Sequence, residues 1–296
     1  MDAEVLVIGE ALIDIVETPD GDRELVGGSP ANVAVGLARQ GHAVRLLTRL
    51  GRDDRGTRIA AHVHTSGVGV DERSWADEPT STARARLRAD GSAEYEFAIA
   101  WDVPVSPPAG LRAVHTGSIA LFLEPGGAAV LETLRAAAGE VLVSVDPNIR
   151  PALVGDREAA LARFADAAAS ADLVKLSDED AAWLYPGIDA EGVLERIAGY
   201  GPRLVVMTRG ADGAIGRGPG GVVAVRPLSV SVVDTIGAGD AYMASLVSSA
   251  LDDPAVFEDA EAFARALRRA AVMAGITVSR AGANPPTRDE IDARLD

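Results

Sequence analysis

Residues Asp234-Thr235-Ile236-Gly237-Ala238-Gly239-Asp240 place three small residues between two carboxylates, directly before a helical pattern. That pattern consists of Met243, Leu246, Val247 and Ala250, whose spacings of three, four and seven residues predict a helix with one apolar face. A glycine-rich turn that leads into a helix exposes free backbone N–H groups and the positive end of the helix dipole. The segment therefore predicts an anion site, for phosphate above all, at the start of a helix.

Asp240 lies at the edge of this predicted anion site, where a carboxylate would repel phosphate unless it has a chemical role. We interpret it as the group that accepts a proton from a hydroxyl while the loop stabilises charge on a transferring phosphoryl group. On this interpretation, a Gly239→Val side chain would occupy the anion site and block the approach of phosphate.

The composition of the 296 residues is that of a globular protein that can bury a large core, with 48% hydrophobic and 24% charged residues. The formal net charge of −16 argues against nucleic acid and anionic membranes as partners. The acidic N-terminus lacks the start of a secretory signal, and no apolar run reaches the about 18 residues that span a bilayer. The absence of cysteine excludes disulfides and thiolate chemistry, and it fits a cytoplasmic enzyme.

Short apolar runs alternate with amphipathic segments over most of the chain, which predicts a mostly parallel sheet with helices on both sides. The predicted strands are Val5–Ile8, Val44–Thr48, Ala113–Thr116, Val141–Val145, Leu173–Leu176 and Leu204–Met207. The predicted helices are Ala31–Gln40, Arg55–Thr65, Gly127–Ala138 and Arg157–Ala171. Ligands of such sheets bind at the carboxyl ends of the strands.

Two segments, residues 12–26 and 83–105, interrupt this alternation within a single domain of residues 1–296. Asp20-Gly21 and Asp90-Gly91 each stand between extended stretches, which indicates hairpins. The segments are predicted to form a small β layer that acts as a lid, and the alternative is a pair of ordinary edge hairpins. A lid with open edges also favours a homodimer through the lid.

A second glycine cluster, Gly27-Gly28-Ser29-Pro30-Ala31-Asn32, is predicted to open another helix. Ser29 suits the N-cap and Pro30 the first helical position, while Gly41 can end the helix in a left-handed conformation. Asn32 offers the donor and acceptor groups that sugar hydroxyls require. Taken alone, the cluster is also compatible with a simple turn at a helix start.

Together the two clusters resemble the paired signatures of the ribokinase-like (PfkB-type) carbohydrate kinase family. The resemblance extends over nearly the whole chain, through Gly9-Glu10-Ala11-Leu12-Ile13-Asp14, Gly51-Arg52-Asp53-Asp54-Arg55-Gly56, Asp146-Pro147-Asn148-Ile149-Arg150, Thr208-Arg209-Gly210 and Arg280-Ala281-Gly282-Ala283. The segment at 146–150, with Lys175-Leu176-Ser177-Asp178-Glu179-Asp180, looks most like the bacterial fructokinase branch.

The resemblance implies a Rossmann-like three-layer α/β/α sandwich with a β-sheet lid, and ATP-dependent phosphorylation of a sugar hydroxyl. It implies that Asp240 is the general base and that the backbone of Gly237, Ala238 and Gly239 forms the anion hole. The residues that would bind or contact the sugar are Asp14, Gly27, Gly28, Asn32, Tyr95, Phe97, Asn148 and Arg150.

The resemblance also implies a nucleotide site and two cation sites. ATP would lie along Ser177, Thr208, Gly210, Gly213, Gly239, Ala271 and Gly275. Asp180 would help to place Mg²⁺, in part through water, and Asp234, Ile236, Ser279 and Gly282 correspond to a K⁺ site of several members. Many members carry Asn-x-x-Glu where this chain has Ser177 and Asp180, so the chain departs from the family pattern at these two positions.

Three questions stay open at this level. The substrate is fructose first, with ribose, 2-keto-3-deoxygluconate or a nucleoside as alternatives, and a non-catalytic binding protein is a further alternative. Arg84, Arg86 and Arg88 alternate along one strand. An inward arginine face would favour an acidic substrate, whereas an outward one would be a solvated surface of the lid. Tyr95, Phe97 and Trp101 are candidates to stack on a substrate ring.

Overall fold

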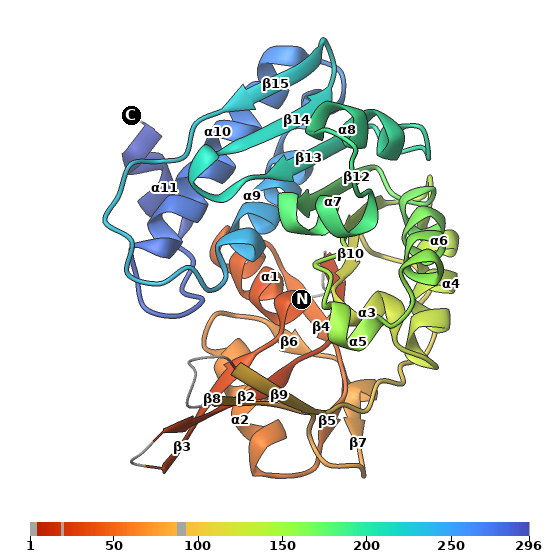
Figure 1. The fold of residues 1–296 in the computed structure, drawn as a ribbon, viewed down its shortest axis with the longest axis vertical. Helices are drawn as coiled ribbons and strands as arrows, with labels where there is room; N and C mark the ends of the chain where they lie inside the picture. Colours follow the sequence, from red (N-terminus) through yellow and green to blue (C-terminus); the bar gives the residue numbers. More distant parts are fainter. Residues whose placement is uncertain (1–4, 19–20, 88–92, 296) are drawn as a thin grey trace.

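A large sheet covered by helices on both faces forms the body of the molecule, in a computed structural model that describes residues 5–18, 21–87 and 93–295 (Figure 1). The nine strands follow the order β15-β14-β13-β12-β11-β10-β1-β4-β6. The parallel strands are β1 (Val5–Ile8), β4 (Val44–Leu47), β6 (Gly69–Val70), β10 (Ala113–Gly117), β11 (Leu142–Asp146), β12 (Leu173–Ser177) and β13 (Leu204–Thr208). The hairpin of β14 (Ala214–Gly218) and β15 (Gly221–Val225) continues the sheet antiparallel.

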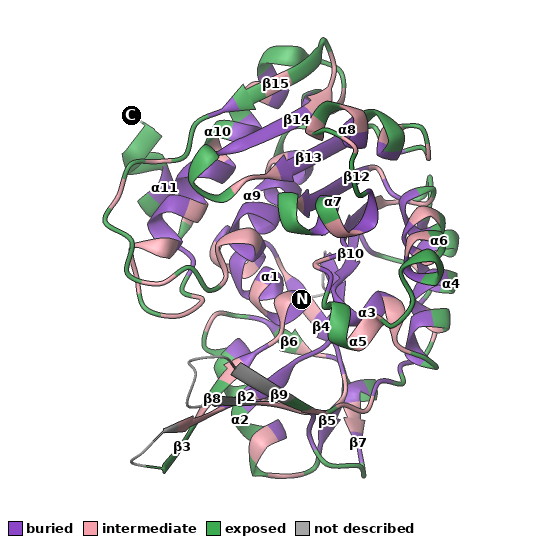
Figure 2. Ribbon diagram, in the orientation of Figure 1, coloured by how far each residue is buried: buried purple, intermediate pink, exposed green. Residues whose placement is uncertain are grey.

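The predicted parallel strands are confirmed, each within one residue at either end. They are buried from both sides, as their continuous apolar runs require (Figure 2). One layer of helices contains α1 (Ser29–Arg39), α2 (Asp54–His64), α9 (Ala238–Asp252), α10 (Ala260–Val278) and α11 (Arg288–Leu295). The other contains α3 (Ile119–Phe122), α4 (Gly126–Ala137), α5 (Pro151–Val154), α6 (Arg157–Ala168), α7 (Asp178–Leu184) and α8 (Ala190–Ala198). The expected three-layer sandwich is therefore confirmed.

Helix α9, which follows the glycine-rich segment at 234–240, differs from the predicted helix with one apolar face. It lacks a solvated face, because even its polar residues Ser245 and Ser248 are fully buried. The helix packs against α1 and α10 and reaches β11 and β12. The predicted apolar positions are therefore buried, but α9 is an interior helix rather than an amphipathic surface helix.

A second, four-stranded sheet has the order β3-β2-β8-β9. Its strands are β2 (Leu12–Thr18), β3 (Gly21–Gly27), β8 (Thr82–Leu87) and β9 (Ala93–Ala98). The pairs β2–β3 and β8–β9 are antiparallel, while the predicted turns at Asp20 and at Asp90-Gly91 lie outside the described residues. The register places Asp14, Leu25 and Phe97 on one face of this sheet.

The second lid segment ends earlier than the expected residue 105. After β9 the chain returns to the main body, where Trp101 is 5% exposed and its indole N–H donates to the Ala120 carbonyl at 2.9 Å. Trp101 also lies against Gly126, so closely that a Cβ there would meet its ring at 2.5 Å. The indole is part of the core, and the expectation that Trp101 stacks on a substrate is wrong.

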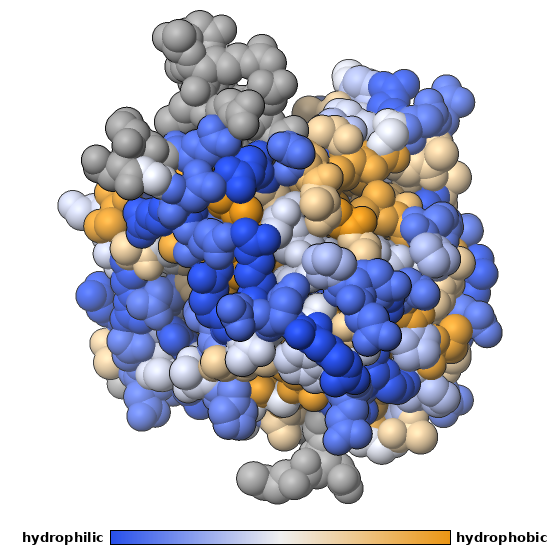
Figure 3. Space-filling view, turned by 90° about the horizontal axis from the view of Figure 1, so that it is seen from below, coloured by the Kyte–Doolittle hydropathy of each residue, from blue (hydrophilic) through white to orange (hydrophobic). Residues whose placement is uncertain are grey.

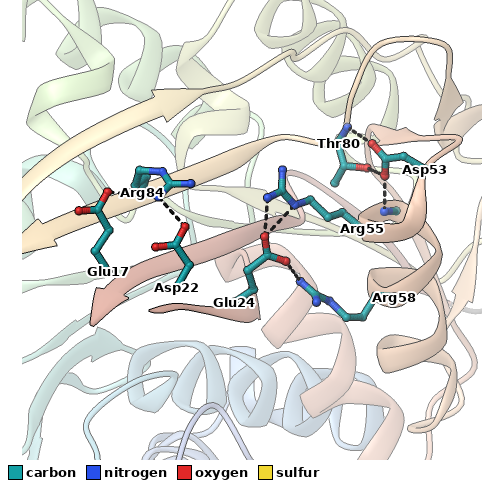
Figure 4. A network of polar contacts seen from close by, with 9 residues as sticks. Glu17, Asp22, Glu24, Asp53, Arg55, Arg58, Thr80 and Arg84 are labelled. Atoms are coloured by element: carbon teal, nitrogen blue, oxygen red, sulfur yellow. Dashed lines mark hydrogen bonds and ion pairs between the residues drawn. The ribbon is translucent and has the colours of Figure 1, made fainter. Parts of the chain in front are cut away.

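On the face of the lid sheet opposite to Asp14, ion pairs connect β3 to α2 and connect the lid strands to one another (Figure 4). Glu24 of β3 accepts from Arg55 and Arg58 of α2, at 3.1 Å from Arg55 Nε and 2.5 Å from Arg58. Arg84 pairs with Glu17 at 3.2 Å and Asp22 at 2.8 Å. Arg84 therefore lies on the face away from Asp14, which favours the solvated-surface alternative; the side chains of Arg86 and Arg88 lie outside the described residues.

The remaining short elements complete the connections. They are β5 (Leu50–Gly51), β7 (Trp75–Ala76) and the 3₁₀ turns η1 (Glu72–Ser74), η2 (Gly210–Asp212) and η3 (Pro254–Phe257). Viewed from the lid end, the surface is mostly hydrophilic, with hydrophobic residues gathered on one side (Figure 3). No helix in the described part of the chain is both long and apolar enough to cross a bilayer.

Close packing of α1 against α9 depends on Gly36. A Cβ at this position would lie 2.6 Å from Ala244 Cβ and 3.3 Å from Met273 Cε. The two helices therefore approach more closely than any side chain would permit, which brings their N-terminal ends together at one edge of the sheet.

Replacement of Gly36 by valine should destabilise the protein by about 1–3 kcal/mol, because the added methyl groups overfill a close-packed contact. Urea unfolding followed by circular dichroism measures the change. Ala182→Val, on the exposed side of α7, is the matched control and should change stability by less than about 0.5 kcal/mol. Equal effects of the two substitutions would show that the α1–α9 contact tolerates a larger side chain.

Candidate functional site

The N-terminal ends of α1 and α9 meet at the carboxylate of Asp240, which is 8% exposed. Ser29 Oγ donates to Asp240 Oδ1 at 2.6 Å, and Asn32 Nδ2 donates to Asp240 Oδ2 at 2.8 Å. Ser29 is therefore not the N-cap that its sequence position predicted: Gly28 holds that place, and no side chain caps α1. The Ser29 hydroxyl instead binds the carboxylate of the other glycine cluster.

The Gly27-Gly28 turn has no room for side chains. A Cβ on Gly27 would lie 2.0 Å from Asp14 Oδ2, so the Asp14 carboxylate lies directly over this glycine. Gly28 has φ 113°, and a Cβ there would meet the Glu10 carbonyl oxygen at 2.4 Å. Burial raises the pKa of Asp14, and the charge of Arg150 partly opposes this shift. The turn thus brings Asp14 to the same edge as Asp240.

Glu10, to which the sequence analysis gave no role, is the most perturbed carboxyl group near Asp240. It follows β1, is 6% exposed, and its Oε2 has no hydrogen-bond partner among the described residues. Burial raises its pKa to about 7, although a Ser118 hydrogen bond and the charge of Arg150 act in the opposite direction. A carboxylate directly after a buried strand, at the edge where ligands bind, was the available signal.

The glycine segment before α9 presents backbone N–H groups. Gly237 is left-handed, with φ 76°, and a Cβ on it would lie 2.6 Å from Ala283 Cβ. Within the described chain, the amides of Gly237, Gly239 and Asp240 have no acceptor, whereas the Ala238 amide donates to the Thr235 carbonyl at 3.3 Å. Of the expected donors 237, 238 and 239, the first and third therefore have free amides, and the Asp240 amide is a further free donor beside them.

Gly239 lies beside a buried lysine. A Cβ at this position would lie 3.0 Å from Lys175 Nζ. The Lys175 ammonium is buried and donates to Asp146 Oδ2 at 2.7 Å and to the Gly239 carbonyl at 3.2 Å. Gly239→Val would therefore press against Lys175, a contact that the sequence did not predict.

Ser177 and Asp180 form a capping box at the start of α7. Ser177 Oγ accepts from the Asp180 amide at 3.0 Å, and Asp180 Oδ2 accepts from the Ser177 amide at 2.9 Å. The other oxygen, Oδ1, accepts from the Ile149 amide at 2.7 Å. The structure thus uses this pair to join α7 to the 146–150 segment.

The other residues that the sequence analysis expected to contact the sugar lie on the 146–150 segment and on β9. Asn148 has φ 35° and its side-chain oxygen accepts from Arg150 Nη1 at 2.8 Å. The Arg150 charge acts on both Asp14 and Glu10. Phe97 of β9 is half-buried on the Asp14 face of the lid sheet, while the side chain of Tyr95 lies outside the described residues.

The residues expected on the nucleotide side lie at the ends of β12 and β13 and along α10. Thr208 ends β13, and its hydroxyl lies 3.4 Å from the Leu176 carbonyl. Gly210 and Gly213 have φ 50° and 80°, as the tight turn between β13 and β14 requires. Ala271 and Gly275 lie one turn apart on α10, where a Cβ on Gly275 would meet Leu228 Cβ at 2.5 Å.

The residues expected to hold K⁺ come from two loops that the structure brings together. Asp234 Oδ1 accepts from the Ile236 amide at 3.0 Å, and Oδ2 accepts from the Gly282 amide at 2.9 Å. These bonds lower the pKa of Asp234. Ser279 ends α10 beside these loops. Across the residues that the structure describes, no group of three or more His, Cys, Asp or Glu side chains forms a ready-made metal centre.

Comparisons with known proteins show the family to which the chain belongs. The model of the pfkB family carbohydrate kinase matches residues 2–290. A fructokinase of Rhizobium leguminosarum bv. trifolii is 32% identical over 261 residues, which is 83% of this chain and 79% of that protein. The structure of a fructokinase with bound ATP from Xylella fastidiosa matches with a TM-score of 0.86 at 26% identity, over 99% of this chain and 98% of its own.

A third match is a fructokinase double mutant from Vibrio cholerae O395, in a fructose, ADP and potassium ion bound form. Its TM-score is 0.84 at 25% identity, and the match covers 100% of both chains. The family model spans nearly the whole sequence, and the three relatives are all named fructokinase. The chain therefore belongs to the pfkB family of ATP-dependent carbohydrate kinases and to its fructokinase branch.

Proposed function

We propose that the protein transfers the γ-phosphoryl group of ATP to a hydroxyl of a fructose-like sugar, with Asp240 as the general base. The observation that carries the proposal is the position of Asp240: its carboxylate accepts hydrogen bonds from Ser29 and Asn32 of the first glycine cluster, and it follows directly on the unpaired loop amides of the second. A carboxylate so placed accepts the proton of an attacking hydroxyl, while the amides stabilise charge on the transferring group.

The sugar is proposed to lie between the lid sheet and the turn at Gly27-Gly28. Asp14 and Asn32 orient its hydroxyls, Asn148 and Arg150 close the site from the main sheet, and Phe97 contacts the ring from the lid. Asn32 donates to Asp240 in this structure, so it is already aligned to bridge the sugar and the base. Tyr95 is proposed to join Phe97 on the ring.

ATP is proposed to lie along Thr208, Gly210 and Gly213 towards α10. The anion hole is proposed from the backbone of Gly237, Ala238 and Gly239, with the free amide of Asp240 beside it. Mg²⁺ neutralises phosphate charge in such transfers and needs only one or two carboxylates from the protein. Asp180 is the proposed carboxylate on this side.

K⁺ is proposed to bind where Asp234 joins the two loops, with the carbonyls of Ile236, Ser279 and Gly282 as ligands. We also propose a homodimer that forms through the lid, because β3 and β9 are edge strands and Leu25 on the Asp14 face is 39% exposed. The cysteine-free composition supports a cytoplasmic location.

A substrate panel tests the proposed specificity. We expect ADP release to depend on the added sugar, with kcat/KM highest for fructose among fructose, ribose, 2-keto-3-deoxygluconate and adenosine. Coupled pyruvate kinase and lactate dehydrogenase measure the ADP. Highest kcat/KM with another compound would reassign the substrate, and no sugar-dependent ADP at all would reject the kinase activity.

Asp240→Asn should lower kcat about a hundredfold or more, because proton acceptance in the transition state is lost. ATP binding, followed by fluorescence of an ATP analogue, should persist because the loop amides remain. The control is Asp166→Asn on the exposed surface of α6, which should keep kcat within about twofold. A near-normal kcat for Asp240→Asn would remove this residue from the role of base.

Glu10 should make the folded protein less stable as pH rises. Its pKa is raised from 4.5 to about 7 in the folded state, so the folded state binds more protons than the unfolded state between these pH values. The stability from this group is full below about pH 4.5 and is lost as pH rises to about 7, by up to about 3 kcal/mol.

Glu10→Gln imitates the protonated form and should flatten this dependence. Urea unfolding at several pH values between 5 and 8 measures it, with the exposed Glu191→Gln as the matched control. An identical slope in Glu10→Gln and the unsubstituted protein would show that Glu10 titrates alike in the folded and unfolded states.

A further inference from the structure

Lys175 is the only lysine of the chain, and it is buried in the middle of β12. It is 3% exposed, and its partner Asp146, at the end of the neighbouring strand β11, is 1% exposed. Their Nζ–Oδ2 distance is 2.7 Å. The other basic residues of the chain are arginines and four histidines. One buried lysine beneath the proposed catalytic edge of the sheet therefore needs an explanation.

Stability alone does not explain the pair. A buried ion pair costs much of its Coulomb energy in lost hydration, and apolar residues of similar size often stabilise a core as well or better. The pair is also incompletely satisfied, because Asp146 Oδ1 has no hydrogen-bond partner among the described residues. The feature that an apolar pair would lack is the bond from Lys175 Nζ to the Gly239 carbonyl, at 3.2 Å.

We propose that Lys175 is a positioning residue for phosphoryl transfer, which holds the first turn of α9 through the Gly239 carbonyl and keeps positive charge beneath Asp240. The inference rests on the proposed role of Asp240 as the base. The Gly239 carbonyl and the free Asp240 amide belong to the same peptide plane, so a fixed carbonyl fixes the direction of this N–H donor. The space for the ammonium exists because residue 239 has no side chain.

The charges around the ammonium keep it protonated. Burial alone would lower the pKa of Lys175, but the carboxylates of Asp146, Asp240 and Asp180 outweigh burial and raise it. Burial raises the pKa of Asp146 to about 6, against the opposing charge of Lys175. His115 of β10 also faces the pair, and burial lowers its pKa to about 3, so it adds no charge at neutral pH.

The two members of the pair should therefore move the acid limb of the kcat–pH profile in opposite directions. Lys175→Met removes a positive charge near Asp240 and should shift the limb to higher pH by about one unit, with kcat reduced. Asp146→Asn removes a negative charge near Asp240, keeps the lysine, and should shift the limb to lower pH by roughly half a unit. A merely structural pair would lose activity in both variants without opposite shifts.

The measurement uses the full chain with fructose and ATP, after circular dichroism has established that each variant is folded. Glu10 interacts electrostatically with Asp240 and has its pKa raised to about 7, so both variants are also made in a Glu10→Gln background. Opposite shifts in both backgrounds support the proposal. Unmoved limbs, or shifts in the same direction, overturn it.

Two further comparisons keep the outcome decisive. If Lys175→Met does not fold, Asp146→Asn alone tests the proposal, and an acid limb that stays in place or moves up overturns it. If Asp240→Asn is inactive while the limbs do not shift, only the role of Lys175 fails. If Asp240→Asn stays active, the proposed base fails, whatever the limbs do.

Discussion

The site depends on one polar contact between residues that are far apart in sequence. Asp240 accepts hydrogen bonds from Ser29 and Asn32, across separations of 211 and 208 residues. This contact needs the two helices that carry it to lie closer than normal side chains allow, and Gly36 provides that approach. The glycines at 27 and 28 then bring Asp14 and the Glu10 backbone to the same place. The proposed catalytic edge is thus built by small residues that let charged groups come together.

The parallel strands, the helices between them and the two glycine clusters could be predicted from the sequence, because each depends on local patterns of burial and backbone freedom. Lys175 shows what those patterns miss. It stands in an apolar strand, and its meaning depends on Asp146 and on a carbonyl of a helix that begins 63 residues later, at Ala238. No spacing rule connects these three groups before the sheet is assembled.

The contacts of individual side chains were the second feature that could not be predicted from the sequence. Ser29 occupies a position that suits an N-cap, yet Gly28 is the N-cap and the Ser29 hydroxyl donates a charge-assisted hydrogen bond to the Asp240 carboxylate. Trp101 looked like an exposed lid residue, yet the chain turns into the core just before it. Gly239 was expected to leave space for an anion, and nothing in the sequence indicated that an added Cβ would also lie 3.0 Å from the Lys175 ammonium.

The capping box at the start of α7 connects two segments at one edge of the main sheet. Asp180 binds the Ser177 amide with one oxygen and the Ile149 amide with the other, so the end of β12 and the segment before Arg150 share a single carboxylate. A longer or uncharged side chain at this position would alter both attachments at once. An exchange at position 180 therefore reaches beyond the helix that carries it, because the same carboxylate also fixes the loop that leads into Arg150.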